Sequence, residues 1–201
     1  MKSYNDCHLK RLIQGQHCWF GEDYHKTILG LSSPEIVLEY IDVLPKHENL
    51  ILVNYEPIDD SINCNSLVGM FDILLHRNII PTFIDADFCN SIKNSGDDLI
   101  YIYNKCKKLN KNITISFTFS IRGVGLENTI KWLHSNFPEI WFGLTGLSKT
   151  PFADFKWKYR QFAYCYGDCV HYRESGDQMF TGIIKLKKYD SKGSNPNSKE
   201  V

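Results

Sequence analysis

Two carboxylates, Asp85 and Asp87, stand at the end of an apolar segment and are the strongest candidates for chemistry in this chain. The helical pattern before them stops at Pro81, and residues 82–84 indicate a buried strand. In α/β folds, ligand binding and catalysis collect at the carboxyl ends of parallel strands. The two acids therefore lie where a functional site is expected.

A second group of acids follows another apolar segment. Glu56 ends the strand predicted for residues 50–55, and Asp59 and Asp60 come shortly after it. Clusters of carboxylates hold Mg²⁺ or Mn²⁺, and two-metal hydrolases use such ions to bind phosphate and activate water. The alternative is that these acids are solvated loop residues or helix N-caps.

Basic residues at two further places could contact phosphate. Arg122 lies in a glycine-containing segment between a strand and a helix, where backbone amides bind phosphate well, although a turn that needs glycine is the plainer interpretation. Lys156, Lys158 and Arg160 alternate with aromatic residues. That alternation suits single-stranded nucleic acid, and it also suits an amphipathic surface.

Two thiols and an imidazole, Cys165, Cys169 and His171, lie close together in the sequence. Structural zinc usually needs paired ligand clusters with a regular spacing, and here there is one cluster with an unusual spacing. Ordinary free cysteines are the simpler interpretation, and a zinc-stabilised interaction module is the alternative.

Composition restricts the class of protein. The chain has 201 residues, 43% of them hydrophobic, which suits a single domain over residues 1–186 followed by a polar, disordered tail over residues 187–201. Basic and acidic residues both number 23, so no global charge attracts nucleic acid. We expect no membrane span and, from seven scattered cysteines and a polar N-terminus, a reducing compartment, the cytoplasm or the nucleus.

Strands and helices alternate in the predicted pattern. Strands are predicted for residues 50–55, 80–84, 113–119 and 140–144, and residues 182–186 could be one more. Helical spacing of apolar residues follows Ser32-Ser33-Pro34-Glu35 and recurs over residues 67–75, 99–106 and 130–137. A repeat of about 30 residues is typical of βα units, which predicts an α/β fold, either a doubly wound sheet or a (β/α) barrel.

The order of these segments resembles the TatD family of metal-dependent deoxyribonucleases over about residues 17–146. The resemblance rests on five segments, which are Phe20 to His25, Asn54 to Asp60, Pro81 to Asp87, Ile115 to Ser120, and Phe137 to Thr145. It implies a TIM-barrel-like fold, metal ligands Glu56 and Asp85, catalytic residues Asp87 and His25, and Mg²⁺ or Mn²⁺ as cofactor. It also implies DNA as the partner.

The chain departs from the family pattern in ways that weaken the metal site. The opening strand with its paired metal histidines has no counterpart, and Ile115 replaces a further ligand. We therefore expect a barrel that is incomplete or remodelled at both ends, with a degenerate metal site and weak or absent hydrolase activity. An active Mg²⁺- or Mn²⁺-dependent phosphodiester hydrolase is one alternative, and a non-enzymatic interaction module is another. Exposed barrel edges would allow self-association or binding of a partner protein.

Overall fold

The computed structural model describes residues 25–31, 47–54, 62–63, 66–140, 164–166, 169–174 and 177–189. Within these ranges there are eight strands and three helices. The strands are β1 (His25–Leu31), β2 (His47–Asn54), β3 (Ile62–Asn63), β4 (Phe83–Ser91), β5 (Ile113–Ser120), β6 (Tyr164–Tyr166), β7 (Cys169–Glu174) and β8 (Asp177–Leu186). The helices are α3 (Leu67–His76), α4 (Ile92–Leu109) and α5 (Leu126–Asn136).

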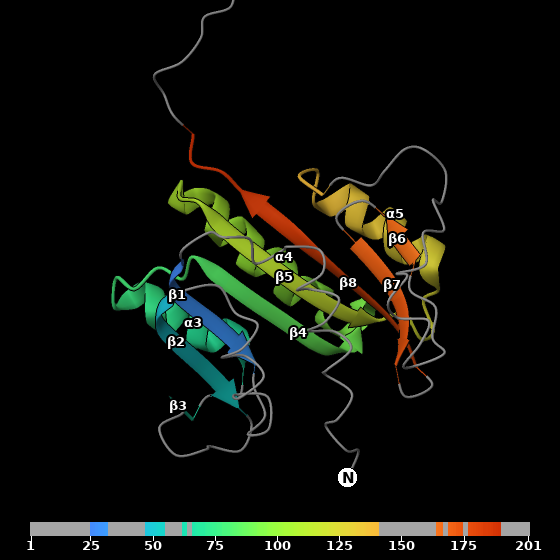
Figure 1. Ribbon diagram of the computed structural model, residues 1–201, viewed down its shortest axis with the longest axis horizontal. Coiled ribbons are helices and arrows are strands. Elements are labelled where there is room, and N and C mark those ends of the chain that lie inside the picture. Colours follow the sequence, from blue (N-terminus) through green and yellow to red (C-terminus); the bar gives the residue numbers. More distant parts are fainter. Residues whose placement is uncertain are drawn as a thin grey trace, which may run out of the picture.

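All eight strands belong to one mixed sheet with the order β3-β2-β1-β4-β5-β8-β7-β6 (Figure 1). The first five strands in this order are parallel to their neighbours. The last three run antiparallel, beginning with β8 against β5. Strands β2 and β3 follow β1 on one side of the sheet, and β4 then pairs with β1 on its other side. Among the described strands, β3 and β6 are the two edges, so the sheet is open.

The TIM-barrel prediction was therefore wrong, although the coarser prediction of an α/β fold with parallel strands is confirmed. In a (β/α) barrel each strand pairs with the next strand along the chain, whereas here β4 pairs with β1 rather than with β3. The alternation of strand and helix is common to barrels and doubly wound sheets. The sequence pattern consequently did not separate the two.

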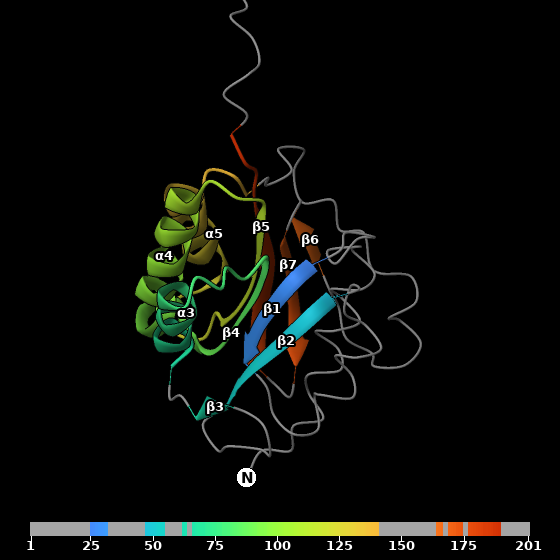
Figure 2. The same ribbon diagram turned by 90° about the vertical axis from the view of Figure 1, so that its left-hand side faces the viewer.

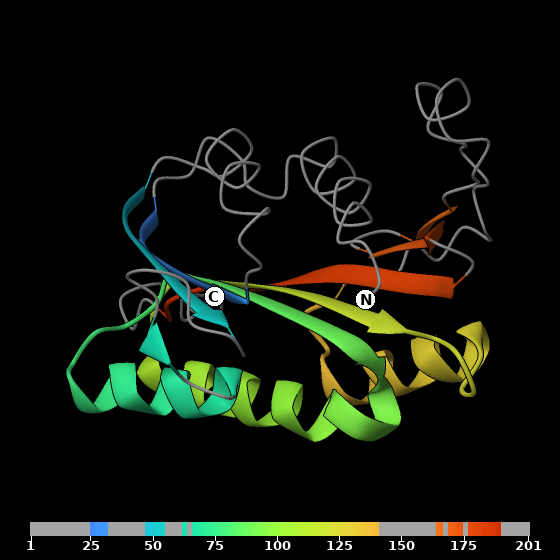
Figure 3. The ribbon, with the colours of Figure 1, turned by 90° about the horizontal axis from the view of Figure 1, so that it is seen from below.

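The helices α3, α4 and α5 all cover the same face of the sheet (Figures 2 and 3). They confirm the three helices predicted over residues 67–75, 99–106 and 130–137. Ser66 caps the start of α3, because its Oγ accepts a hydrogen bond of 2.9 Å from the backbone N–H of Gly69. None of the helices in the described ranges is long and apolar enough to cross a membrane.

Strand β5 shows how the sheet separates its two faces. Four apolar side chains alternate along it with four hydroxyl side chains, and the apolar set packs into the core under the helices. The apolar set is Ile113, Ile115, Phe117 and Phe119, and the hydroxyl set is Thr114, Ser116, Thr118 and Ser120. Because Thr114 alone in β5 is not fully buried, both faces of this strand are covered.

The central contact of this core depends on a glycine in β8. Gly182 lies opposite Phe117 on one side and Cys169 on the other. A Cβ atom at position 182 would lie 2.4 Å from Cζ of Phe117 and 2.6 Å from Sγ of Cys169. Glycine is required there because the side chains of both neighbouring strands occupy the space that a Cβ would need.

Several predicted elements lie partly or wholly outside the described residues. These are the helix predicted after Ser32 and most of the strand predicted for residues 140–144. Strand β8 includes the segment 182–186 and is longer than expected. Strands β1, β3, β6 and β7 were not predicted from the sequence.

Candidate functional site

The point where the strand order reverses lies between β1 and β4. These two strands pair from Ile28 and Phe83 to Gly30 and Asp85, and the pairing ends there. Beyond that point β1 continues along β2, while β4 continues along β5. The two strands therefore diverge directly after Gly30 and Asp85. In open α/β sheets, ligands bind in the crevice that forms at the carboxyl ends of strands at such a reversal.

Asp85 and Asp87 lie on β4 at this divergence. Ile84 and Ala86 pack into the core beneath the helices, so the two aspartates face the opposite side of the sheet. Asp85 is fully buried and Asp87 is partly buried. Gly30, which is in register with Asp85, has no side chain on that face. The arrangement offers carboxylate acceptors for the hydroxyl or cationic groups of a ligand.

A row of hydroxyl groups continues across the same face of the sheet. Ser116 is in register with Asp85, and Thr118 is in register with Asp87. Thr118 Oγ1 lies 2.9 Å from Thr181 Oγ1, and Thr181 Oγ1 donates a hydrogen bond of 2.8 Å to the backbone oxygen of Phe117. Both threonines are buried. The polar surface beside the aspartates is thus built from short side chains held by their own hydrogen bonds.

The turn between β5 and α5 brings Arg122 to the carboxyl edge of the sheet. Gly123 and Gly125 have φ values of 74° and 83°, in the left-handed region that glycine adopts without strain. This confirms that the turn needs its glycines. Arg122 is exposed, and its backbone N–H donates to Oγ of Ser120 at 3.3 Å. Its role in binding phosphate stays a prediction.

The other predicted site residues do not join the two aspartates among the described residues. His25 is the first residue of β1, five positions before Gly30, which places its backbone about 16 Å away along the strand. Glu56, Lys156, Lys158 and Arg160 lie outside the described residues. The catalytic role predicted for His25 came from the family resemblance alone, and His25 is the first residue of β1.

The predicted metal sites find no counterpart in the described ranges, where no three His, Cys, Asp or Glu residues lie close enough together to hold an ion. Cys169 is buried and pairs with Gly182, while the backbone of Cys165 pairs with Val170. His171 pairs with Phe180 across β8. The zinc-module interpretation therefore gains no support from this part of the sheet.

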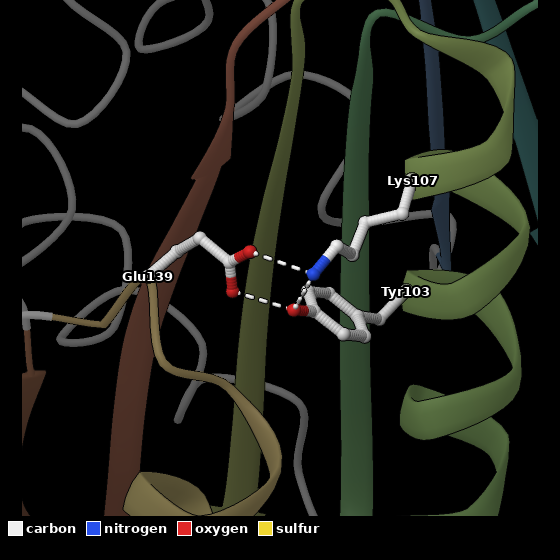
Figure 4. Close-up of polar contacts among 3 residues, drawn as sticks. All are labelled: Tyr103, Lys107 and Glu139. Carbon is white, nitrogen blue, oxygen red and sulfur yellow. Dashed lines mark hydrogen bonds and ion pairs between the residues drawn. The ribbon is translucent and has the colours of Figure 1, made fainter.

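A cluster of ionisable groups at the other end of the molecule joins α4 to the segment after α5 (Figure 4). Tyr103 Oη donates a hydrogen bond of 2.6 Å to Glu139 Oε2, and Lys107 Nζ lies 3.1 Å from Tyr103 Oη and 3.2 Å from Glu139 Oε1. Burial, followed by the hydrogen bond to Glu139, raises the pKa of Tyr103. Tyr103 thus stays a neutral donor at physiological pH, and the cluster acts as a clamp between helices rather than as a base.

No protein-family model matches the sequence, and no curated protein matches it. The solved structures that match the fold include the following two. One is a protein from Streptococcus mutans assigned as a SAM-dependent methyltransferase, with 12% identity and a TM-score of 0.52, and the match covers 91% of this chain and 49% of that one. The other, SMU.776, is assigned as a methyltransferase and is complexed with SAH, with 14% identity, a TM-score of 0.50, and 91% and 50% of the two chains covered.

These matches show a shared fold, and this chain spans about half the length of the solved structures it matches. They overturn the TatD resemblance, since the matching structures are methyltransferases with a sheet like this one rather than nucleases with a barrel. The deoxyribonuclease function and its two alternatives were wrong with it. The Mg²⁺ or Mn²⁺ cofactor was also wrong, since the ligand in the second structure is SAH.

Proposed function

We propose that this chain is the cofactor-binding domain of a Rossmann-type SAM-dependent methyltransferase. The observation that carries the proposal is the divergence of β1 and β4 directly after Gly30 and Asp85, with Asp87 further along the same edge. The likeness in fold to two methyltransferase structures supports it.

The groups at the divergence fit SAM in their chemistry. SAM carries a ribose with two hydroxyl groups, an ammonium group and a sulfonium cation, and carboxylates form strong hydrogen bonds with such donors and attract such cations. One feature of dinucleotide-type sites is missing, because the residues after β1 are Ser32-Ser33-Pro34-Glu35 rather than a turn with closely spaced glycines. Gly30, inside the end of β1, is the nearest glycine.

The two aspartates would have different tasks. Asp87 is partly exposed, so it can accept hydrogen bonds directly from the ribose hydroxyls or the ammonium group. Asp85 is buried on the same face of β4, where a carboxylate is screened less by water and acts more strongly on a nearby cation. When bound, SAM supplies an electrophilic methyl group, and the residues of this chain hold it in place and exclude water.

Calorimetric titration of the purified protein with SAH tests the proposal. We expect binding in the micromolar range, weakened about 10- to 100-fold by Asp87→Asn, because a hydrogen bond to a charged group contributes about 1.5–3 kcal/mol. Asp98→Asn is the matched control, since Asp98 is an exposed aspartate on α4. Circular dichroism shows whether each variant is folded.

Two results would contradict the proposal. The first is no heat of binding from folded wild-type protein with SAH at about 1 mM, the weak end of specific affinity. The second is an equal loss of affinity in Asp87→Asn and Asp98→Asn, which would show that the loss reflects charge alone.

A further inference from the structure

Lysines gather where α4 ends, β5 begins and β8 ends. Because β8 is antiparallel to β5, with Leu186 opposite Ile113, its last residues return to the turn that follows α4 (Figure 1). Five exposed lysines lie on these three segments, and we refer to them as the lysine platform. They are Lys108, Lys111, Lys185, Lys187 and Lys188.

The platform keeps its charge, whereas neighbouring lysines are neutralised. Lys105 lies 3.9 Å from Asp72, and Lys107 lies 3.2 Å from Glu139. None of the five platform lysines forms an ion pair with another residue in the described ranges. A chain with no net charge thus concentrates positive charge at one corner of its sheet. Such a local patch attracts polyanions even when the whole chain does not.

Hydrogen bonds tie the backbone after β8 to the turn after α4. The backbone N–H of Lys188 donates to Asn112 Oδ1 at 2.8 Å, and that of Tyr189 donates to Asn110 Oδ1 at 2.7 Å. Asn110 has a left-handed backbone with φ of 49°, which ends α4 and turns the chain toward β5. The segment after β8 is therefore tied to the end of α4. Lysines on a fixed backbone lose less entropy on binding than lysines on a mobile one.

An exposed aromatic residue adjoins the lysines. Tyr189 is 86% exposed, whereas the other exposed large apolar residues of the described chain are between 36% and 38% exposed. An aromatic ring in water beside lysines gains free energy by stacking on a nucleic-acid base, while the lysines contact the phosphates. This combination of groups is typical of surfaces that bind single strands.

We propose that the lysine platform and Tyr189 bind single-stranded nucleic acid. An anionic membrane surface would need several apolar side chains beside the lysines, and an acidic protein would need a pocket for its anchor residues. Tyr189 is the single large exposed apolar residue on the three platform segments of the described chain. The platform lies at the amino end of β5, whereas Asp87 is in register with Thr118, five residues and about 17 Å further along that strand. It is therefore an anchoring site, independent of the proposed SAM site.

Fluorescence anisotropy with a labelled oligo-U RNA and a labelled oligo-dT DNA, in the absence of SAM, tests the proposal. Five phosphate contacts predict a slope of about −3.5 for log K against log[salt], and therefore about a hundredfold loss of affinity from 50 to 200 mM salt. The double variant Lys187→Glu/Lys188→Glu should bind at least about tenfold more weakly, with a slope of about −2. Tyr189→Ala should weaken binding about fivefold or more with little change in slope.

The control is Lys93→Glu/Lys131→Glu, which changes net charge equally at exposed positions on α4 and α5. Retained affinity and slope in the control, with loss in the platform variant, supports the proposal. Equal loss in both variants would overturn it, because the attraction would then be general. Binding to phosphatidylserine vesicles without binding to either oligonucleotide would overturn it in favour of a membrane surface.

Discussion

The buried pair Thr118 and Thr181 allows a prediction whose magnitude follows from the direction of its hydrogen bonds. Thr181 Oγ1 is 2.8 Å from the backbone oxygen of Phe117, which can only accept, so the single hydroxyl proton of Thr181 is used there. At the 2.9 Å contact between the two hydroxyl groups, Thr118 must then be the donor. The two hydrogen bonds therefore run in one direction, from Thr118 to Thr181 and from Thr181 to the backbone of β5.

Replacement of either threonine by valine keeps the side-chain shape but removes one hydroxyl. Thr118→Val removes the first donor and leaves Thr181 with its own donor bond intact, so we expect a loss of about 0.5–1.5 kcal/mol. Thr181→Val removes both bonds and leaves the buried hydroxyl of Thr118 without its acceptor, so we expect a loss of about 2–3 kcal/mol. The double variant leaves no orphaned hydroxyl, and its loss should be smaller than the sum of the two single losses.

Urea unfolding followed by circular dichroism measures these differences, and thermal unfolding should show the same order at about 2–4 °C per kcal/mol. The prediction depends on the asymmetry of the pair. Equal losses in Thr118→Val and Thr181→Val, or losses that add in the double variant, would refute the assigned direction of the hydrogen bonds.

Two further predictions concern the core and the helix clamp. Gly182→Ala should cost about 2–3 kcal/mol in urea unfolding because its Cβ would lie 2.4 Å from Phe117, and a loss below about 0.5 kcal/mol would mean that the core yields easily. Burial raises the pKa of Glu139. Hydrogen bonds from Tyr103, from its own backbone and from Lys107, together with the charge of Lys107, lower it by more than burial raises it, so the pKa is below the usual range. A carboxyl group with a lowered pKa stabilises the fold at pH values above its unfolded pKa of 4.5, and this stability is lost as pH falls through the folded pKa. Glu139→Gln should therefore cost about 1–2 kcal/mol near pH 7 and progressively less in acid. A cost that is independent of pH in urea unfolding would contradict this.

The parts of the fold that could be predicted are those with strong periodicity. Helices α3, α4 and α5 each carry an apolar stripe, and β5 is a continuous buried strand, so local pattern was sufficient. Strand β1 was missed because it begins with His25 and Lys26, whose polarity hides a central strand. Without β1 the position of β4 could not be known. The choice between barrel and open sheet depends on that one pairing.

The prediction for Asp85 and Asp87 rested on a rule that does not depend on the choice of fold. In barrels and in doubly wound sheets alike, ligands bind at the carboxyl ends of parallel strands. Strand β4 continues to Ser91, however, so Asp85 and Asp87 lie inside it rather than at its end. The family resemblance failed because its matches were single residues set in apolar strands, and apolar strands of any α/β fold align with one another. The catalytic role predicted for His25 came from such a match, and His25 lies at the start of β1, away from the two aspartates. The strand register thus places all three residues anew: Asp85 and Asp87 lie within β4, beside the end of its pairing with β1, and His25 lies at the start of β1. The binding roles of the two aspartates stay a prediction.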